Sequence, residues 1–145
     1  MVEIKKANRG DFKKIAEIYS SSFSEEPYSE SWTNKKAFEK IKLLSKYCEI
    51  WKAVNKKEIV GFIAINPNQF YPGRVAFGEE MAVKKNFRNK GIGSSILKEI
   101  FKIYSDREFE IFNGISNKKS KAFKLYKKLG ILESKDNILI ERKLK

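Results

Sequence analysis

The chain has 145 residues, 41% of them hydrophobic, which predicts a single domain with a hydrophobic core. Because it contains no histidine and only one cysteine, histidine-based catalysis, an intramolecular disulfide and a cysteine-ligated zinc site within one chain are excluded, and we expect no metal. The formal charge of +13, from 31 Lys and Arg against 18 Asp and Glu, favours anionic partners.

The N-terminal third predicts a strand followed by two helices. Residues 1–8 alternate apolar and polar side chains, and Asp11 then precedes apolar residues at helical spacing, so we expect it to cap the first helix. A polar loop over residues 24–32 ends where Thr33 and Asn34 can cap a second helix. The apolar face of that second helix is expected to consist of Phe38, Ile41, Leu44 and Tyr47.

The middle of the chain predicts strands and a glycine-containing turn. Residues 49–54 and 58–65 are rich in β-branched and aromatic side chains and are separated by three polar residues, which indicates a hairpin. A loop with two prolines leads to a strand over 75–83. Residues 87–93 then form a turn before a helix with apolar positions from Ile96 to Tyr104.

The C-terminal part predicts a strand over 109–115, a helix ending at Gly130, and a hairpin formed by residues 131–133 and 138–144. The resulting order is β-α-α-β-β-β-α-β-α-β-β, without repeats or linkers, and predicts one α/β domain over residues 1–145 with a mixed sheet. From Lys84 onward there are 17 Lys and Arg against 7 Asp and Glu, so most of the positive charge lies in this half.

The apolar runs are short. The longest, residues 59–65, is far below the ~20 residues that a bilayer-spanning helix needs, and the N-terminal segment has no apolar core of the kind found in secretory signals. We therefore expect a soluble, cytoplasmic protein with no membrane partner and a reduced Cys48.

The segment from Arg88 to Gly93, Arg-Asn-Lys-Gly-Ile-Gly, lies between a predicted strand and a predicted helix. The first amides of a helix have no partners within it, and glycines allow a phosphate to approach the backbone, so a pyrophosphate would fit. The segment lacks the final Lys-Ser/Thr of a Walker A loop, and Ile96 stands where a dinucleotide fingerprint has its third glycine. A glycine turn that only starts a helix is the alternative.

Two motifs carry a family resemblance. Met81-Ala82-Val83, followed five residues later by Arg88 and the Gly-x-Gly, resembles the acetyl-CoA-binding segment of the GNAT superfamily of N-acetyltransferases. Residues 122–130, Ala-Phe-Lys-Leu-Tyr-Lys-Lys-Leu-Gly, are similar to the family's Ala-x-x-Leu-Tyr-x-x-x-Gly-Phe helix, with Ile131 in place of the Phe. The resemblance implies a GNAT-like fold, with helices on both faces of a mixed central sheet, and an acetyl-CoA-dependent N-acetyltransferase.

The resemblance also implies how acetyl-CoA is bound. A bulge would splay the strand over 79–83 from its parallel neighbour over 109–115, and the pantetheine arm would pair with backbone groups of Met81 and Val83. Amides from Arg88 or Asn89 through Ser94 would hold the pyrophosphate, and an amide of Met81 or Ala82 would stabilise the thioester oxyanion. The family often has Asn three residues before the alanine, where this chain has Lys119, with Asn117 two residues earlier. The expected cofactor-binding positions are Met81, Ala82, Val83, Arg88, Asn89, Lys90, Gly91, Ile92, Gly93, Ser94, Asn117, Lys119 and Tyr126.

Catalytic roles follow from the same resemblance. Tyr126 occupies the position whose hydroxyl can protonate the departing CoA thiolate; a core-facing aromatic is the alternative. Amine attack needs a base, and Glu79 and Glu80 lie on the strand beside the expected thioester. Strict alternation places Glu79 on the face shared with Met81 and Glu80 on the opposite face, and it favours Glu79, while a purely structural carboxylate remains open for both.

The loop between the first two helices suggests the acceptor. It resembles the corresponding loop of GNAT proteins similar to aminoglycoside N-acetyltransferases, and its acidic and aromatic side chains would attract a cationic amine. Ordinary solvation of a helix start is the alternative. The expected acceptor-site residues are Glu25, Glu26, Tyr28, Glu30 and Trp32.

These observations together predict transfer of acetyl to a primary amine by direct attack in a ternary complex. A small cationic amine is the preferred acceptor, with a peptide N-terminus or protein lysine as the alternative. Two other classes stay open: a CoA-binding sensor without turnover, and a nucleic-acid-binding domain that uses the basic C-terminal half, although no known nucleic-acid module matches. Both a monomer and a homodimer are compatible with the sequence.

Overall fold

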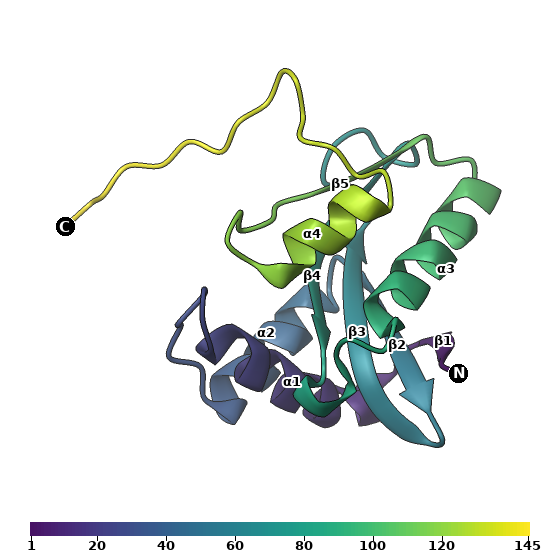
Figure 1. Cartoon of the computed structure of the whole chain (residues 1–145), viewed down its shortest axis with the longest axis vertical. Helices are drawn as coiled ribbons and strands as arrows, with labels where there is room; N and C mark the ends of the chain where they lie inside the picture. The colour runs from purple at the N-terminus through teal and green to yellow at the C-terminus, as the bar shows by residue number, and fades with distance from the viewer.

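A computed structural model of residues 1–145 shows a mixed five-stranded sheet with helices on both faces, as expected (Figure 1). The sheet order is β1-β2-β3-β4-β5, antiparallel except for the parallel pair β4 and β5. No helix is long and apolar enough to cross a membrane. The elements are β1 (Glu3–Lys6), α1 (Phe12–Ser24), α2 (Asn34–Leu44), β2 (Glu49–Asn55), β3 (Glu58–Asn66), β4 (Val75–Val83), α3 (Ile92–Asp106), β5 (Ile111–Gly114) and α4 (Lys121–Lys128), with short 3-10 turns at Arg9–Asp11 and Lys85–Phe87.

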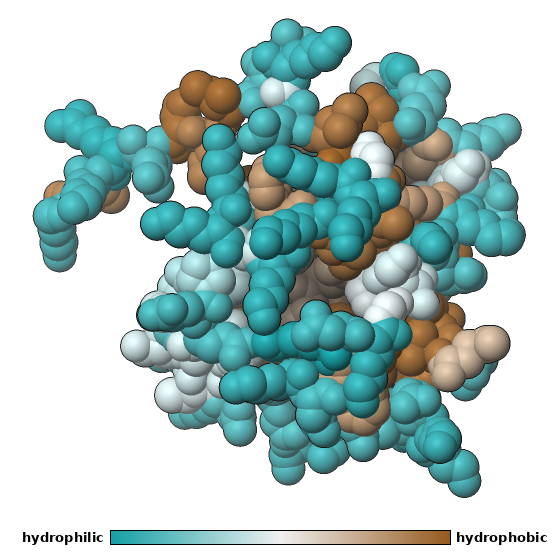
Figure 2. Space-filling view, in the orientation of Figure 1, coloured by the Kyte–Doolittle hydropathy of each residue, from teal (hydrophilic) through white to brown (hydrophobic).

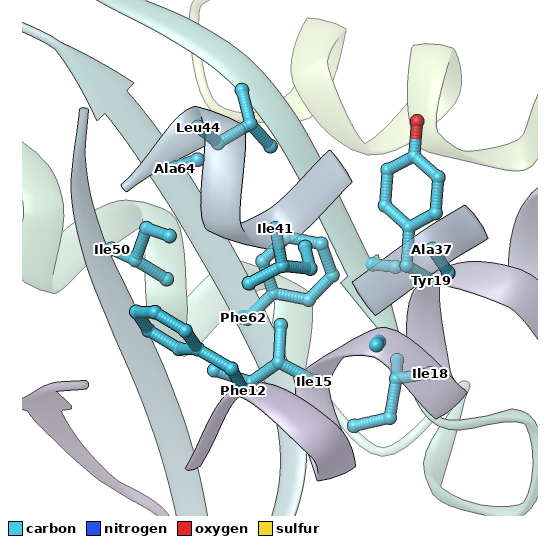
Figure 3. Packing of buried hydrophobic residues seen from close by; sticks show 12 residues of the cluster. Phe12, Ile15, Ile18, Tyr19, Ala37, Ile41, Leu44, Ile50, Phe62 and Ala64 are labelled. Carbon is cyan, nitrogen blue, oxygen red and sulfur yellow. The ribbon is translucent and has the colours of Figure 1, made fainter. Parts of the chain in front are cut away.

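The sheet separates two hydrophobic clusters. Helices α1 and α2 cover one face, where Phe62 of β3 is buried among side chains such as Ile15 and Ile41 (Figure 3). Helix α3 covers the other face with Ile96 and Ile100, and α4 packs against the same cluster. Apolar side chains on alternating sides of β3 enter both clusters, which explains why this strand is almost continuously buried.

Two expectations for the N-terminal helices need correction. The buried face of α2 consists of Ala37, Ile41 and Leu44, whereas Phe38 and Tyr47 are 37% and 41% exposed, because the i, i+4, i+7 stripe begins one residue earlier and Tyr47 lies beyond the helix end. Thr33 caps α2 as expected, its Oγ1 accepting from the Lys36 N–H. Asp11 makes no side-chain cap on α1; it accepts from the Asn8 N–H and pairs with Lys52 instead.

The expected C-terminal hairpin is absent. Residues 131–145 contain no strand and run away from the body to the C-terminus (Figure 1), so the element order ends at α4. The strand expected over 109–115 is shortened to the four residues of β5. Alternating apolar residues near the C-terminus indicate side chains that favour burial, but they do not specify a partner strand. An isolated two-stranded hairpin is at best marginally stable in water, so this pattern alone does not determine a hairpin.

Candidate functional site

The site is built where β4 and β5 part. The two strands pair only over Val75–Gly78 and Ile111–Gly114, which leaves the second half of β4 without a neighbour on that side. Against β3, Ala64 pairs with Glu80 and Ile65 with Gly78, so Glu79 is an extra residue in a β-bulge. A bulge bends its strand and increases the local twist, which accounts for the divergence from β5. The bulge and the splay that the family resemblance implies are both present.

The open side of β4 carries backbone groups. The Lys84 N–H donates to the Val60 carbonyl of β3 at 2.8 Å, and alternation along an antiparallel strand therefore directs the backbone groups of Met81 and Val83 away from β3. The Val83 carbonyl accepts from Arg88 Nε at 2.9 Å, so that acceptor is already engaged. Met81 has both its backbone groups on the open side.

A row of unpaired amides lies at the start of α3. Gly91 precedes the helix with φ of +79°, and the first bond of the helix is donated by the Ser95 N–H to the Gly91 carbonyl at 3.0 Å. The backbone N–H groups from Asn89 to Ser94 make no hydrogen bond within the chain, whereas that of Arg88 donates to the Lys85 carbonyl. Such amides, reinforced by the helix dipole, bind anions, so the set that fits a pyrophosphate begins at Asn89 rather than Arg88.

Gly93 has a different role from Gly91. A Cβ at Gly91 would meet nothing within 4 Å, and its requirement for glycine comes from the positive φ. A Cβ at Gly93 would lie 3.0 Å from Leu125 Cδ2, so this glycine allows α4 to approach the first turn of α3. The close approach brings the helix that carries Tyr126 next to the amide row.

The Arg88 side chain joins the loop between α1 and α2 to β4. Besides its bond to Val83, it donates from Nη2 to Ser22 Oγ at 3.0 Å and forms an ion pair with Glu25 through Nη1. A second cation, Lys85 Nζ, lies 4.0 Å from Glu25 Oε2. Glu25 was expected to bind substrate, but its charge is balanced by cations of the protein itself.

Glu80 and Tyr126 are the titratable groups with the clearest chemistry. Burial raises the pKa of Glu80 to about 7; Lys40 opposes the shift, and Glu30 and Glu79 reinforce it. The Tyr19 hydroxyl lies 3.5 Å from Glu80 Oε1. Burial also raises the pKa of Tyr126 to about 12, with further contributions from Tyr28 and Glu80, and its hydroxyl has no hydrogen-bond partner within the chain. Near neutral pH a carboxylate able to take a proton and a phenol that retains one are thus close enough to interact.

Glu80 lies on the α1 and α2 face, as alternation predicts, since it reaches Tyr19 there and Ala82, two residues further on, is buried in the same cluster. Glu79 is the extra residue of the bulge, and its charge raises the pKa of Cys48, as the charge of Glu80 does. Glu79 Oε1 lies 3.4 Å from Asn66 Nδ2. Burial is the main cause that brings the pKa of the Cys48 thiol to about 12, which keeps it protonated and poorly nucleophilic.

Two of the five expected acceptor-site residues, Glu30 and Trp32, lie near Glu80, and a third, Tyr28, lies near Tyr126. The Trp32 ring packs edge-on against Tyr19 with centroids 4.8 Å apart, and its Nε1 donates to Glu30 at 2.9 Å. Tyr28 packs on Phe23 and acts electrostatically on Tyr126. Glu26 is exposed and makes none of these contacts.

The polar residues before α4 are largely structural. Asn117 Oδ1 accepts from the Lys119 N–H at 2.8 Å and its carbonyl accepts from Ser120, which in turn caps α4. The Lys119 side chain is exposed. Asn113 was missed by the sequence analysis: it lies opposite Phe77 at the end of the paired segment, and its Oδ1 is buried without a partner. A lone amide between Phe112 and Gly114 in an apolar strand is the signal that would have found it.

Comparisons with known proteins agree with this geometry. The family model described as "Acetyltransferase (GNAT) family" matches residues 12–131. No curated protein matches the sequence. The fold is similar to that of a possible acetyltransferase from Clostridium difficile 630, with a TM-score of 0.80 and 18% identity over 100% of this chain and 99% of that chain.

Two further solved structures have names that state a substrate. Aminoglycoside N-acetyltransferase AAC(6')-Iy in complex with CoA has a TM-score of 0.75 and 13% identity over 100% of this chain and 96% of that chain. Ribosomal-protein-alanine N-acetyltransferase from Brucella melitensis biovar Abortus 2308 has a TM-score of 0.75 and 16% identity over 98% and 99%. At these identities the structures establish the fold and not the acceptor.

The raised pKa of Glu80 predicts a pH-dependent stability. Between the ordinary value of 4.5 and about 7, the folded chain holds a proton on Glu80 that the unfolded chain has lost, so raising the pH through this window lowers the free energy of unfolding. Replacing Glu80→Gln removes this titration, and we expect a shallower fall for the variant in urea denaturation between about pH 5 and pH 7. Parallel curves for the parent and the variant would contradict the burial of this carboxylate.

Proposed function

Because the chain belongs to the GNAT family of acetyltransferases, whose acetyl donor is acetyl-CoA, we propose that it acetylates the primary amine of a small cationic molecule by direct attack in a ternary complex. The observation that carries the proposal is the junction of three features on one short stretch of structure. These are the open edge of β4 at Met81, the unpaired amides that begin at Asn89, and the pair formed by Glu80 and Tyr126.

The donor site uses main-chain groups. The amides from Asn89 to Ser94 would bind the pyrophosphate, and the open edge at Met81 would pair with the pantetheine amides in the manner of an added strand. Asn113 Oδ1, a buried acceptor without a partner at the point where the strands part, suits an amide N–H of the same arm. Bound acetyl-CoA supplies a thioester carbonyl as the electrophile.

The Met81 amide is the better oxyanion donor of the two considered. Alternation directs the Ala82 N–H towards β3, where it belongs to the sheet, and the Met81 N–H towards the open side. A preorganised backbone donor at that position stabilises the negative charge that develops on the thioester oxygen as the amine attacks.

Glu80 is proposed as the general base. A cationic amine must lose a proton to attack, and a carboxyl whose pKa is about 7 is matched to accept it near neutral pH, directly or through one water. The Tyr19 hydroxyl orients this carboxylate. Glu79, which alternation favoured, is instead turned towards Asn66 in the bulge.

Tyr126 is proposed as the general acid. Its raised pKa keeps the phenol protonated throughout the neutral range, and its hydroxyl has no partner within the chain that would compete for the proton. Its electrostatic interaction with Glu80 supports a position on the side of β4 where the thioester would lie. Protonation of the thiolate prevents its return to the acetyl group.

The acceptor is inferred from charge and aromatic character. Glu30 interacts electrostatically with Glu80, Trp32 packs against Tyr19 beside it, and Tyr28 lies near Tyr126, which makes an acidic and aromatic environment in a protein of net charge +13. Such surroundings attract an ammonium group. An aminoglycoside is the acceptor that the name of one structurally similar protein states, and an alanine of a ribosomal protein is that of another, so small amines and peptides both belong in the acceptor screen.

The donor site predicts the effect of filling the space beside the amides. Trp in place of Gly91 would project into open space next to the amide row, and we expect acetyl-CoA binding to weaken by at least about 10-fold in calorimetric titration. Gly73→Trp is the matched control, because Gly73 has φ of +78° and equally open surroundings but lies outside the site. Equal affinities for the two variants would contradict the proposed pyrophosphate position.

The base predicts a pH profile. For the parent enzyme we expect kcat/KM to rise with pH through an apparent pKa near 7 and then level off. Glu80→Gln should lower kcat/KM by about 10²–10⁴-fold and remove its rise with pH near pH 7. Glu26→Gln, at an exposed position, should retain the parent's kcat/KM and its rise with pH. If Glu79→Gln removed the rise of kcat/KM with pH and Glu80→Gln retained it, the general base would be Glu79.

The acid predicts a loss of turnover without loss of binding. Tyr126→Phe keeps the ring packing but removes the proton, so we expect kcat to fall by about 10²-fold or more while the affinity for acetyl-CoA measured by calorimetry stays nearly constant. Tyr71→Phe, at an exposed tyrosine, is the control and should behave as the parent does. An unchanged kcat in Tyr126→Phe would remove the acid role.

A further inference from the structure

Lys40 is unusual among the lysines of this chain. Figure 2 shows hydrophilic side chains over most of one face of the molecule, and all lysines except Lys40 and Lys52 are exposed. Lys52 is paired with Asp11 at 2.7 Å, whereas Lys40 is partly buried and forms no ion pair. Lysines are seldom withdrawn from water unless they are paired, because the charge loses hydration. The position of Lys40 therefore points to a use for its charge.

The helical repeat turns Lys40 towards the sheet. It follows Ala37 by three residues and precedes Leu44 by four, and both of these are fully buried on the face of α2 that packs on the sheet. Leu44 and Ala64 of β3 belong to the same hydrophobic cluster (Figure 3). Glu80 pairs directly opposite Ala64, and opposite residues of an antiparallel pair point to the same face. Lys40 and Glu80 therefore approach the same region, one from the helix and one from the sheet.

Lys40 is the only cation among the titratable groups that interact with Glu80. Burial raises the pKa of Glu80 and Lys40 lowers it, while two neighbouring carboxylates raise it further. The groups around Glu80 are Tyr19 of α1, Glu30 in the loop before α2, Lys40 of α2, Tyr47 and Cys48 between α2 and β2, Glu79 of β4 and Tyr126 of α4. Without Lys40, this carboxylate would face only phenols, a thiol and other carboxylates.

We propose that Lys40 is a positioning residue for the reaction, whose ammonium favours the ionised form of Glu80 that accepts a proton from the attacking amine. The inference rests on the proposed function, in which Glu80 is the general base. One proton passes from the amine nitrogen to a carboxylate oxygen of Glu80, and Lys40 keeps its own proton throughout. A carboxyl that stayed protonated could not accept this proton.

The charge of the proposed acceptor disfavours a binding role for Lys40. A cation on α2 repels an ammonium group that approaches Glu80, so a neutral side chain at this position would bind such an acceptor at least as well. The presence of a lysine is instead explained by the base. A buried carboxyl with two carboxylates nearby needs a positive charge beside it to be ionised near neutral pH.

Urea denaturation between about pH 5 and pH 9 tests the interaction without an acceptor. For the parent, the free energy of unfolding should fall with rising pH and level off above about pH 7. In Lys40→Met, which keeps the aliphatic stem but loses the charge, the folded chain should hold the Glu80 proton to higher pH, so the fall continues further. Lys40→Arg, which keeps the charge, and Lys35→Met, at an exposed lysine of the same helix, should follow the parent.

A Glu80→Gln background shows whether the effect passes through Glu80. Lys40→Met should change the pH dependence of unfolding in the parent and leave it unchanged in Glu80→Gln. Circular dichroism confirms that each variant is folded before denaturation. A parent-like curve for Lys40→Met, or an equal change in the two backgrounds, overturns the proposal.

The pH profile of kcat/KM separates the role of Lys40 from the assignment of the base. With the aminoglycoside kanamycin or the polyamine spermidine as acceptor, we expect Lys40→Met to lower kcat/KM by about 3–10-fold near pH 7 and by less than about 2-fold near pH 9. KM should not rise, and Lys40→Arg should resemble the parent. An equal loss at both pH values, carried by KM, assigns Lys40 to acceptor binding and overturns the proposal. If denaturation couples Lys40 to Glu80 but Lys40→Met keeps the parent's pH profile, Glu80 is not the base and Lys40 has no role in the reaction.

Discussion

The separation of β4 from β5 is the constraint on which the site depends. The two strands pair over four residues each, and the bulge at Glu79 follows directly after the last pair. From that point β4 has one edge in the sheet and the other open, so the backbone groups of Met81 stay on the open side while Glu80 turns into the cluster beneath α1 and α2. An open backbone edge and a half-buried carboxylate are consequently neighbours on one strand.

Arg88 joins this strand to the loop between α1 and α2. Its guanidinium bonds Val83 at the end of β4, Ser22 at the end of α1 and Glu25 in the loop beyond. Charge-assisted hydrogen bonds of this kind are shorter and stronger than neutral ones, and the planar fork sets the direction of each. Arg88 therefore holds the loop after α1 against the end of β4, and the charge of Glu25 is balanced within the protein.

Unpaired polar groups and uncovered apolar groups lie in two different places in this chain. The amides from Asn89 to Ser94 and the buried Oδ1 of Asn113 surround the point where the strands part, where a ligand with phosphates and amides would satisfy them. The free edge of β5 lies at the outer end of the sheet, and the apolar run from Ile138 to Ile140 lies on the segment that leaves the body. β5 separates the two regions and contributes to both.

The sequence by itself determined the features that depend on near neighbours. The cap of α2 at Thr33, the glycine turn before α3, the positions of most strands and the family motif around Tyr126 all follow from residue types a few positions apart, because capping, turns and amphipathic spacing are short-range. Only the tertiary structure decided the surroundings of the two carboxylates, Tyr19 beside Glu80 and Asn66 beside Glu79, since the bulge at Glu79 exists through pairing with β3. The ion pair of Arg88 with Glu25 and the absence of the C-terminal hairpin were likewise decided there, because each depends on groups far apart in the chain or on a partner strand that no local pattern specifies.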